Sequence, residues 1–219
     1  PISVVGADCK ELRENGHTDS GVYEIYPYGT YTSPISVYCD MNTEGGGWTA
    51  IQKRVNNGSV SFDRTWKEYK KGFGDAGLDF WIGNEVIYQL TKRQISNLYI
   101  IINLVDGSRL YELYDQFSVS NEADSYRLFL AGNASGTLGD SMMHTGYSRL
   151  NLSGMKFTTS DRDNDQYDEG SCSSLNKGGW WFNNCRLAFL NGPWSTIRWP
   201  PKVTFWTPVY ETLMMIRHH

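Results

Sequence analysis

The sequence lacks the features that mark several large classes of protein. It has no run of the roughly 18 apolar residues that a membrane-spanning helix needs, because its densest apolar segment, residues 98–104, is short. It has no excess of basic residues, with 20 Lys and Arg against 24 Asp and Glu and a net charge of −4. We therefore expect no membrane span and no nucleic-acid binding, which needs a basic surface.

Catalytic motifs are also missing. The chain contains no G-x-S-x-G motif, no H-E-x-x-H motif and no glycine-rich nucleotide-binding loop. Histidine is scarce, with four residues, so that nucleophilic triads lack parts. Carboxylates are plentiful enough for a glycosidase pair, which the sequence leaves open. The pattern as a whole favours a binding module and not an enzyme.

Aromatic residues and glycine are abundant, with 8 Trp, 14 Tyr, 9 Phe and 22 Gly in 219 residues. Such a composition favours strands and irregular loops over helical bundles. The length suits one domain that buries roughly 70% of the surface of the unfolded chain. We expect a single α+β domain over residues 1–219.

Short strands and a few short helices are predicted before residue 132. Helices are expected near Cys9, from a cap at Asp63 through Lys71, and over residues 85–90. A turn is expected at Gly45–Gly47, and Asp106-Gly107 predicts a hairpin. Periodic and β-rich segments predict strands at 21–26, 35–38, 48–55, 98–105, 109–119 and 126–131. From Gly132 onward periodic runs are rare, and a long irregular region of this kind is usually functional.

The four cysteines form a near pair at each end of the chain. Two local disulfides, Cys9–Cys39 and Cys172–Cys185, are the simplest arrangement, and a zinc site is the weaker alternative because neither pair has ligand spacing. Disulfides and Asn-x-Ser sequons together favour a secreted, extracellular glycoprotein. The sequons are Asn57, Asn133 and Asn151.

Carboxylates alternate in the segment Asp161-Arg162-Asp163-Asn164-Asp165. This spacing allows carboxylates to converge on one hard cation such as Ca2+. It matches the first half of an EF-hand loop, but Gln166 stands where the turn needs Gly and Cys172 where a bidentate Glu is required. The segment is therefore a candidate calcium loop of another kind, and a solvated acidic turn is the alternative.

Aromatic and amide residues follow this acidic segment. Trp180-Trp181-Phe182-Asn183-Asn184-Cys185 and the later Trp194 could form a carbohydrate pocket beside a cation. Core packing is the alternative for at least one of the tandem tryptophans.

Many short motifs occur in the order typical of fibrinogen-like C-terminal domains. They include Asp8-Cys9, Val37-Tyr38-Cys39-Asp40-Met41, Gly46-Gly47-Trp48-Thr49, Phe80-Trp81-Ile82-Gly83-Asn84-Glu85, Asp161-Arg162-Asp163-Asn164-Asp165, Trp180-Trp181-Phe182-Asn183-Asn184-Cys185 and Leu190-Asn191-Gly192. The chain resembles this family, which includes ficolins, tachylectins, angiopoietin-like proteins and the fibrinogen chains, over essentially its whole length.

The resemblance implies a central twisted antiparallel sheet with short helices and a long irregular calcium- and ligand-binding region. It implies both disulfides and a cis peptide bond at Asn184–Cys185. Its expected subregions are a disulfide-linked part at 1–47, a central sheet at 48–131 with a C-terminal strand, and a calcium and ligand region at 132–210. The implied calcium ligands are the side chains of Asp163 and Asp165 and backbone carbonyls of Tyr167 and of Glu169 or Gly170.

The resemblance also implies a ligand pocket that differs here from the acetyl-binding members of the family. Arg186 stands where His is common, and Asn176 replaces a pocket Tyr. Arg186 would favour an anionic ligand, and a surface arginine paired with a nearby Asp is the alternative. The amide and aromatic pattern and the resemblance together predict the pocket residues Asn176, Asn184, Cys185, Arg186, Trp194 and Phe205.

The function expected from the resemblance is calcium-stabilised recognition outside the cell. The first interpretation is a lectin-like module of innate immunity that reads acetylated or anionic glycans on microbial or cell surfaces. The alternative is a protein–protein module that binds a receptor, as in angiopoietin-like proteins. Because single sugar sites are weak, we expect multimerisation through a region upstream of Pro1.

Overall fold

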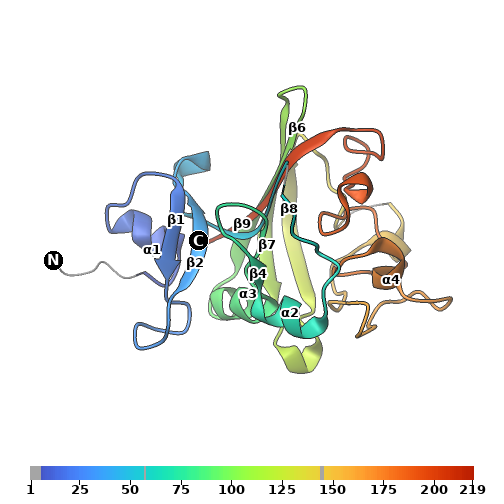
Figure 1. The fold of residues 1–219 in the computed structure, drawn as a ribbon, viewed down its shortest axis with the longest axis horizontal. Helices are drawn as coiled ribbons and strands as arrows, with labels where there is room; N and C mark the ends of the chain where they lie inside the picture. The colour runs from blue at the N-terminus through green and yellow to red at the C-terminus, as the bar shows by residue number, and fades with distance from the viewer. Residues whose placement is uncertain (1–5, 57, 144–145) are drawn as a thin grey trace.

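One antiparallel sheet runs through the molecule (Figure 1), as the resemblance implied. The computed structural model describes residues 6–56, 58–143 and 146–219. Within these residues the sheet has nine strands, and every pairing between them is antiparallel. The main strands, in spatial order, are β1 (Gly21–Ile25), β2 (Ile35–Asp40), β3 (Trp48–Val55), β9 (Val209–His218), β6 (Ser96–Leu104), β7 (Arg109–Val119) and β8 (Leu128–Gly136). Short strands β4 (Phe73–Gly74) and β5 (Phe80–Trp81) join the sheet beside β3.

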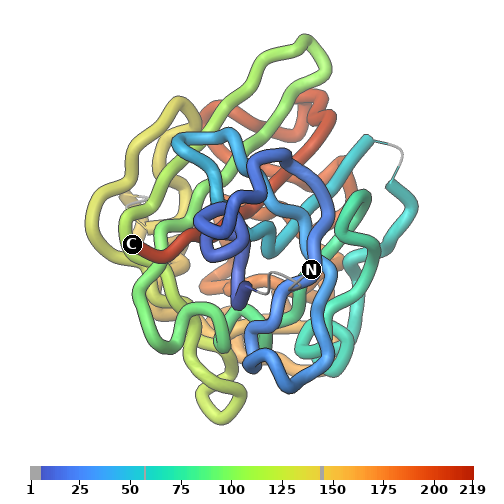
Figure 2. Tube along the Cα trace, turned by 90° about the vertical axis from the view of Figure 1, so that its left-hand side faces the viewer, coloured from blue at the N-terminus to red at the C-terminus, as the bar shows by residue number. Residues whose placement is uncertain are grey.

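The C-terminal strand β9 lies at the centre of this sheet. It pairs with β3 on one side and with β6 on the other, so that Ile216 is opposite both Thr49 and Leu98. Residues from the two ends of the chain therefore meet in one layer, which Figure 2 shows as a red strand among blue and green segments. The sheet cannot form in this order until β9 has been placed between β3 and β6.

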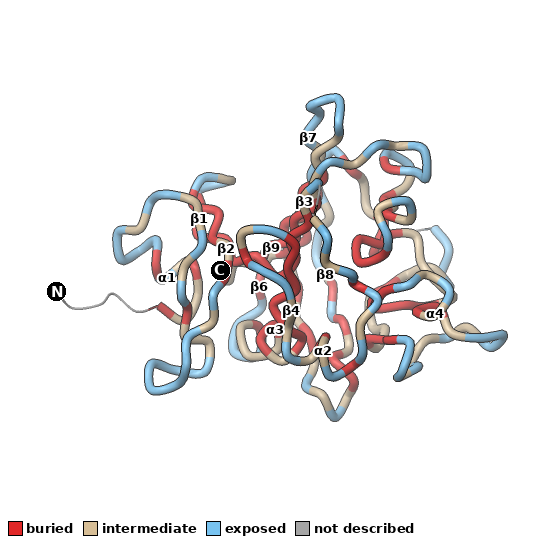
Figure 3. The backbone as a smooth tube through the Cα atoms, viewed as in Figure 1, coloured by how far each residue is buried: buried red, intermediate tan, exposed pale blue. Residues whose placement is uncertain are grey.

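Both faces of the central strands are buried, which explains the nearly continuous apolar run in the middle of β6. In β6, Leu98, Ile100 and Ile102 enter the large core, whereas Tyr99 and Ile101 pack in a smaller cluster on the opposite face. The buried segments form a band along the sheet and into the irregular region (Figure 3).

Helices are short, and the cap of one of them differs from the prediction. Helix α2 begins at Trp66 and not near Asp63, because the hydroxyl of Thr65 accepts the N–H of Glu68 while the Glu68 carboxylate accepts the N–H of Thr65. The α-helices are α1 (Cys9–Glu14), α2 (Trp66–Lys71), α3 (Asn84–Thr91) and α4 (Cys172–Asn176). The 3-10 helices are η1 (Thr43–Gly45), η2 (Glu122–Asp124), η3 (Ser148–Leu150) and η4 (Trp194–Thr196). None of the helices formed by the described residues could cross a membrane.

Strand β8 continues five residues beyond the predicted end at 131, to Gly136. A bulge places two residues, Gly132 and Asn133, opposite the single residue Asp115 of β7. Gly132 has a φ of +77°, which suits glycine, and the N–H of Asn133 donates to the Asp115 carboxylate at 3.1 Å. The bulge thus lets the strand continue past Gly132, where the sequence pattern predicts that it ends.

The irregular region after β8 packs its aromatic residues into the large core of the sheet and is also held to the sheet by buried polar groups. Trp180 and Trp181 are fully buried, so both tandem tryptophans belong to the core. The Gln52 amide of β3 donates to the carbonyl of Leu190 at 3.1 Å and to the Asn191 side chain at 3.2 Å. These bonds hold the functional region against a rigid support.

Candidate functional site

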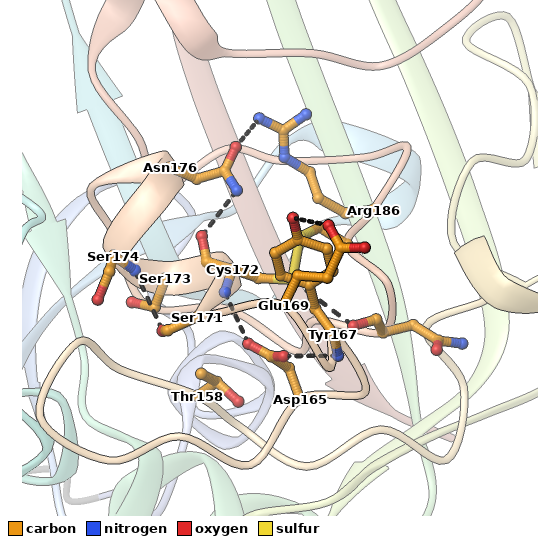
Figure 4. The surroundings of a disulfide bond; sticks show 12 residues. Thr158, Asp165, Tyr167, Glu169, Ser171, Cys172, Ser173, Ser174, Asn176 and Arg186 are labelled. Carbon is orange, nitrogen blue, oxygen red and sulfur yellow. Dashed lines mark hydrogen bonds between the residues drawn. A yellow bond between two sulfur atoms is a disulfide. The ribbon is translucent and has the colours of Figure 1, made fainter.

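Both predicted disulfides are present. Cys9 is joined to Cys39, and Cys172 is joined to Cys185, with Cα–Cα distances of 5.5 and 5.6 Å. The second bond ties the first residue of α4 to the segment that carries the predicted pocket (Figure 4). The peptide bond between Asn184 and Cys185 is cis, as the resemblance implied.

Asp165 is oriented by backbone N–H groups in the acidic loop. Its carboxylate oxygens accept the N–H of Tyr167 at 2.9 Å and of Cys172 at 2.8 Å (Figure 4). Asp163 lies beside it and accepts the N–H of Asp165 at 3.2 Å. Burial, together with the negative charge of Asp163, raises the pKa of Asp165 to about 6. Two carboxylates are therefore held close together with an unfavourable mutual interaction that a cation would relieve.

Asp161, the first carboxylate of the alternating segment, binds a helix N-terminus and does not lie with the other two carboxylates. Its carboxylate accepts the N–H of Trp66, the first residue of α2, at 2.8 Å and the hydroxyl of Thr159 at 2.8 Å. It therefore helps to satisfy the N-terminus of a helix 95 residues away in sequence. The regular spacing suggested three equivalent carboxylates, and the structure separates one from the other two.

The residues of this loop fit a calcium ion only if backbone oxygens or water complete the ligand set. No three His, Cys, Asp or Glu side chains converge as a metal site in the described parts of the chain. The Glu169 carboxylate accepts the Tyr167 hydroxyl at 3.2 Å, and the Tyr167 carbonyl accepts the N–H of Gly170 at 3.4 Å. Asp163 and Asp165 line a polar depression of about 480 Å³. Two carboxylates with carbonyl and water oxygens form a donor set that Ca2+ accepts and that softer metals do not favour.

The two residues that depart from the acetyl-binding members contact each other. The Arg186 guanidinium donates to the side-chain oxygen of Asn176, whose amide in turn donates to the carbonyl of Cys172 at 2.7 Å (Figure 4). The guanidinium also lies over the ring of Phe189, 4.7 Å from its centroid. Arg186 is half-buried and has an amide partner, so it is not the surface arginine paired with Asp that we considered as the alternative.

Arg198 is a second arginine of this region that the sequence reasoning missed. Its guanidinium lies 4.1 Å from the centroid of the Phe205 ring, and its backbone pairs with that of Phe189 at 2.9 Å in both directions. Burial and then the charge of Arg198 lower the pKa of Arg186 to about 10. A lone arginine in an irregular segment gives no sequence signal. Only the folded structure shows that Arg198 lies next to a predicted pocket residue.

The remaining predicted pocket residues do not gather around Arg186. Trp194 packs against the buried Arg54, 4.7 Å from ring to guanidinium, and lines a separate cavity of about 430 Å³ that contains no other predicted pocket residue. The amide of Asn183 donates to the carbonyls of Ser148 and Asn151, which leaves it little capacity for a sugar. Asn184 is half-buried and donates its N–H to the carbonyl of Arg149 at 3.0 Å.

The sequons have different surroundings. Asn133 is exposed on β8, at the bulge. Asn151 is half-buried, and its side-chain oxygen accepts the N–H of Ser153 at 2.9 Å. Asn57 lies outside the described residues.

Comparison with known proteins assigns the family. Residues 5–217 match the family model of the C-terminal globular domain of fibrinogen beta and gamma chains. The chain therefore belongs to the fibrinogen C-terminal domain family. Because this match covers almost the whole chain, the predicted family and fold are confirmed.

Named relatives and solved structures agree with this assignment. Human fibroleukin and bovine angiopoietin-4 are 44% and 43% identical to the chain over 84% of its length, which covers 41% and 35% of those proteins. The fibrinogen-like globe domain of human ANGPTL6 superposes with a TM-score of 0.88 at 36% identity, covering 100% of this chain and 97% of the other. Lamprey fibrin D-dimer in complex with the peptide Gly-His-Arg-Pro-amide gives a TM-score of 0.87 at 33% identity, covering 98% and 74%.

The chain thus spans about two fifths of fibroleukin. Its family consists of binding and structural modules, so the prediction that it is not an enzyme is confirmed. Angiopoietins and an angiopoietin-like globe are the group on which the receptor-binding alternative was based, and the names of these relatives describe no lectin. The comparisons therefore favour the protein-binding alternative over the glycan-binding interpretation.

Proposed function

We propose that the chain is an extracellular recognition module that binds a protein partner through its irregular C-terminal region. Its similarity to angiopoietins and to an angiopoietin-like globe supports a receptor-type partner. Two disulfides support an extracellular setting, because such bonds persist in oxidising compartments.

The observation that carries this proposal is an aromatic turn, Thr204–Thr207, that displays two large rings to solvent. Phe205 is 53% exposed and Trp206 is 92% exposed. The turn is closed by the N–H of Thr207, which donates to the Thr204 carbonyl at 3.2 Å. Large aromatics beside arginine are the residues enriched at the energetic centres of protein interfaces. Exposure of a tryptophan costs solvation free energy in the isolated chain and suits a surface that a partner covers.

A cell-binding experiment tests the proposal. The chain, displayed as a tetramer so that weak sites register, should bind cells, and trypsin treatment of the cells should abolish binding while glycosidase treatment leaves it intact. Trp206→Ala should weaken binding at least tenfold, as for an interface hot spot. Exposed Leu78, 58% accessible, offers the matched control Leu78→Ala. Binding that survives trypsin but not glycosidase would contradict the proposal.

Glycan recognition is a second candidate, favoured by one specific observation. The N–H groups of Cys185 and Arg186 donate no hydrogen bond to any residue of the described ranges. Two adjacent unpaired donors can bind a carbonyl oxygen such as that of an acetyl group. An array of acetylated, sialylated and sulfated glycans, probed with and without EDTA, tests this candidate, and a blank array would exclude it.

We further propose that Ca2+ binds the loop of Asp163 and Asp165, with backbone oxygens from residues 167–170. The ion would neutralise two adjacent carboxylates and order the loop that precedes the Cys172–Cys185 disulfide. Its role would be structural, because these carboxylates and the proposed protein-binding turn belong to different segments of the region.

The wider biology of the chain is also a proposal. Asn133 and Asn151 are candidate glycosylation sites, and Asn133 is the more exposed of the two. Multimerisation through other parts of a longer protein would raise the avidity of a weak single site.

A further inference from the structure

Arg186 and Arg198, here called the arginine pair, carry charges without a carboxylate counterpart. No ion pair within the described ranges includes either residue. Arg186 donates to the neutral amide of Asn176, and the side chain of Arg198 donates to none of the described residues. In both residues Nε is buried and lacks a hydrogen-bond partner. An unpaired donor on a charged group removed from water is costly unless a ligand satisfies it.

The two guanidinium groups are held in place by aromatic rings. Arg186 lies over Phe189, and the Phe189 backbone pairs with Arg198, which itself lies over Phe205. This arrangement fixes two like charges near each other at the surface. The effect of Arg198 is seen in Arg186, whose pKa is lowered by burial and then by the charge of Arg198. Both residues are half-buried, so part of each side chain remains open to a ligand.

We propose that the arginine pair binds the carboxylate of an acidic side chain on the protein partner. The inference rests on the proposed protein-binding function and specifies the chemistry of the partner's anchoring residue. A guanidinium presents parallel donors that match the two oxygens of a carboxylate, and a single anion between two guanidinium groups removes their repulsion. Because Phe205 of the aromatic turn supports Arg198, the partner segment should place an apolar residue next to its Asp or Glu.

Asn176 acts as a positioning residue for the pair. Its amide nitrogen is anchored to the Cys172 carbonyl at 2.7 Å, which directs its oxygen to Arg186. An amide orients the guanidinium without neutralising it. A carboxylate at the same position would supply the missing charge from within the chain and compete with the partner.

The probe for this site is succinate, with succinamide as its neutral counterpart, followed through the arginine Nε–Hε signals by NMR. Succinate should shift the Arg186 and Arg198 signals in a saturable manner, and succinamide should not. R186Q and R198Q should each weaken succinate binding about tenfold or more, the loss of one charge-assisted contact. N176D should also weaken it, because the new carboxylate neutralises Arg186 from within the chain. It also removes the amide donor to the Cys172 carbonyl, so its thermal unfolding is measured beside its binding.

Arg162 provides a matched control. It is also half-buried and lies over an aromatic ring, 3.9 Å from the centroid of Trp66, but it has a hydrogen-bond partner in Ser125. R162Q should leave succinate binding unchanged. Thermal unfolding of each variant separates loss of the site from loss of the fold.

Three results would overturn the inference. The first is an equal shift of the arginine signals with succinamide, and the second is an equal loss of succinate binding in R162Q and R198Q. The third is a methyl sialoside that binds the pair at least tenfold more tightly than succinate, which would assign the pair to glycans. If succinate binds as expected but tetramers do not bind cells through protein, the proposed function fails and the carboxylate site stands. If tetramers bind trypsin-sensitive receptors but succinate does not bind the pair, the carboxylate site fails and the proposed function stands.

Discussion

Single buried polar side chains decide how the irregular region is attached to the sheet. Gln52 is fully buried, and its amide bonds to Leu190 and Asn191 on one side while its oxygen accepts the Thr212 hydroxyl at 3.0 Å on the other. Asn191 is also fully buried and donates to the Gly179 carbonyl at 3.1 Å. Every member has a partner, so the network specifies one docking geometry instead of destabilising the core.

Removing one member of this network should be costly. Asn191→Ala leaves part of the Gln52 amide and the Gly179 carbonyl unsatisfied in a water-free site, so we expect a loss of about 1–3 kcal/mol in the free energy of unfolding. Urea denaturation measures it. The exposed Gln94→Ala, which should change stability by less than about 0.5 kcal/mol, is the control. Equal stability of the two variants would contradict this assignment.

The start of a helix is fixed by capping side chains, which the sequence pattern reveals only in part. Helix α2 has a reciprocal capping box between Thr65 and Glu68. Thr65→Ala removes the side-chain acceptor for the Glu68 N–H, and we expect a loss of about 1 kcal/mol in stability. Asp63→Ala, at the predicted cap, should have a much smaller effect because Asp63 is exposed and does not cap the helix. A larger loss for Asp63→Ala in thermal unfolding would restore the original prediction.

The same capping box predicts a dependence on pH. The N–H of Thr65, and then its hydroxyl, lower the pKa of Glu68 below its usual value. A group whose pKa is depressed by folding stabilises the native state above the unfolded pKa, and this contribution disappears as the pH falls through the folded pKa. We therefore expect Glu68→Gln to be less stable than the native chain at pH 7 and to approach it below about pH 4. Denaturant titrations at both pH values measure the difference, and a gap that widens in acid would refute the mechanism.

The turn before β3 depends on a glycine. Gly46 has a φ of +72°, and an added Cβ would come within 2.0 Å of the Met41 carbonyl oxygen. Gly46→Ala therefore forces the backbone to move and should lower the melting temperature by several degrees, since a loss of 1 kcal/mol corresponds to roughly 2–4 °C at this size. Gly107 also has a positive φ but has open space around its Cβ position, so Gly107→Ala should cost clearly less.

The sequence predicted local features better than contacts between distant segments. The Gly45–Gly47 turn and the Asp106-Gly107 hairpin depend on adjacent residues, and both are found where expected. The two disulfides, which join cysteines 30 and 13 residues apart, are also found as predicted. Strand β8 was cut short because a bulge at Gly132 looks like a strand end in sequence. The predicted cap of α2 at Asp63 is wrong, because the folded backbone places Thr65 and not Asp63 at the N-terminus of the helix.

The candidate site shows the same division. The spacing of the acidic segment was informative, but the bond from Trp66 to Asp161 joins residues far apart in sequence and could not be foreseen. Arg186 was singled out because it replaces a usual residue of the pocket. Its charged neighbour Arg198 was not, because only folding brings the two together.

The whole molecule combines a rigid sheet with an irregular region that has few backbone ladders of its own. The Cys172–Cys185 disulfide closes 13 residues within that region, and a loop of this length contributes about 3 kcal/mol in the chain-entropy description. The bound ion proposed next to it would act on the same segment. The stability of the irregular region should therefore depend on both.

Calcium removal tests this dependence in the intact chain. At a calcium concentration about 100 times the Kd, the native state gains about 2.7 kcal/mol, so EDTA should lower the melting temperature by roughly 5–10 °C. Asp165→Asn should abolish the difference between calcium and EDTA, because it removes one of the two proposed carboxylate ligands. Asp161→Asn should keep that difference although it lowers stability in both buffers, since its carboxylate serves α2. A native chain that melts at one temperature in both buffers, or an Asp161→Asn chain that loses the calcium response while Asp165→Asn retains it, would contradict the proposed ligand set and would leave the disulfide as the main covalent support of the recognition region.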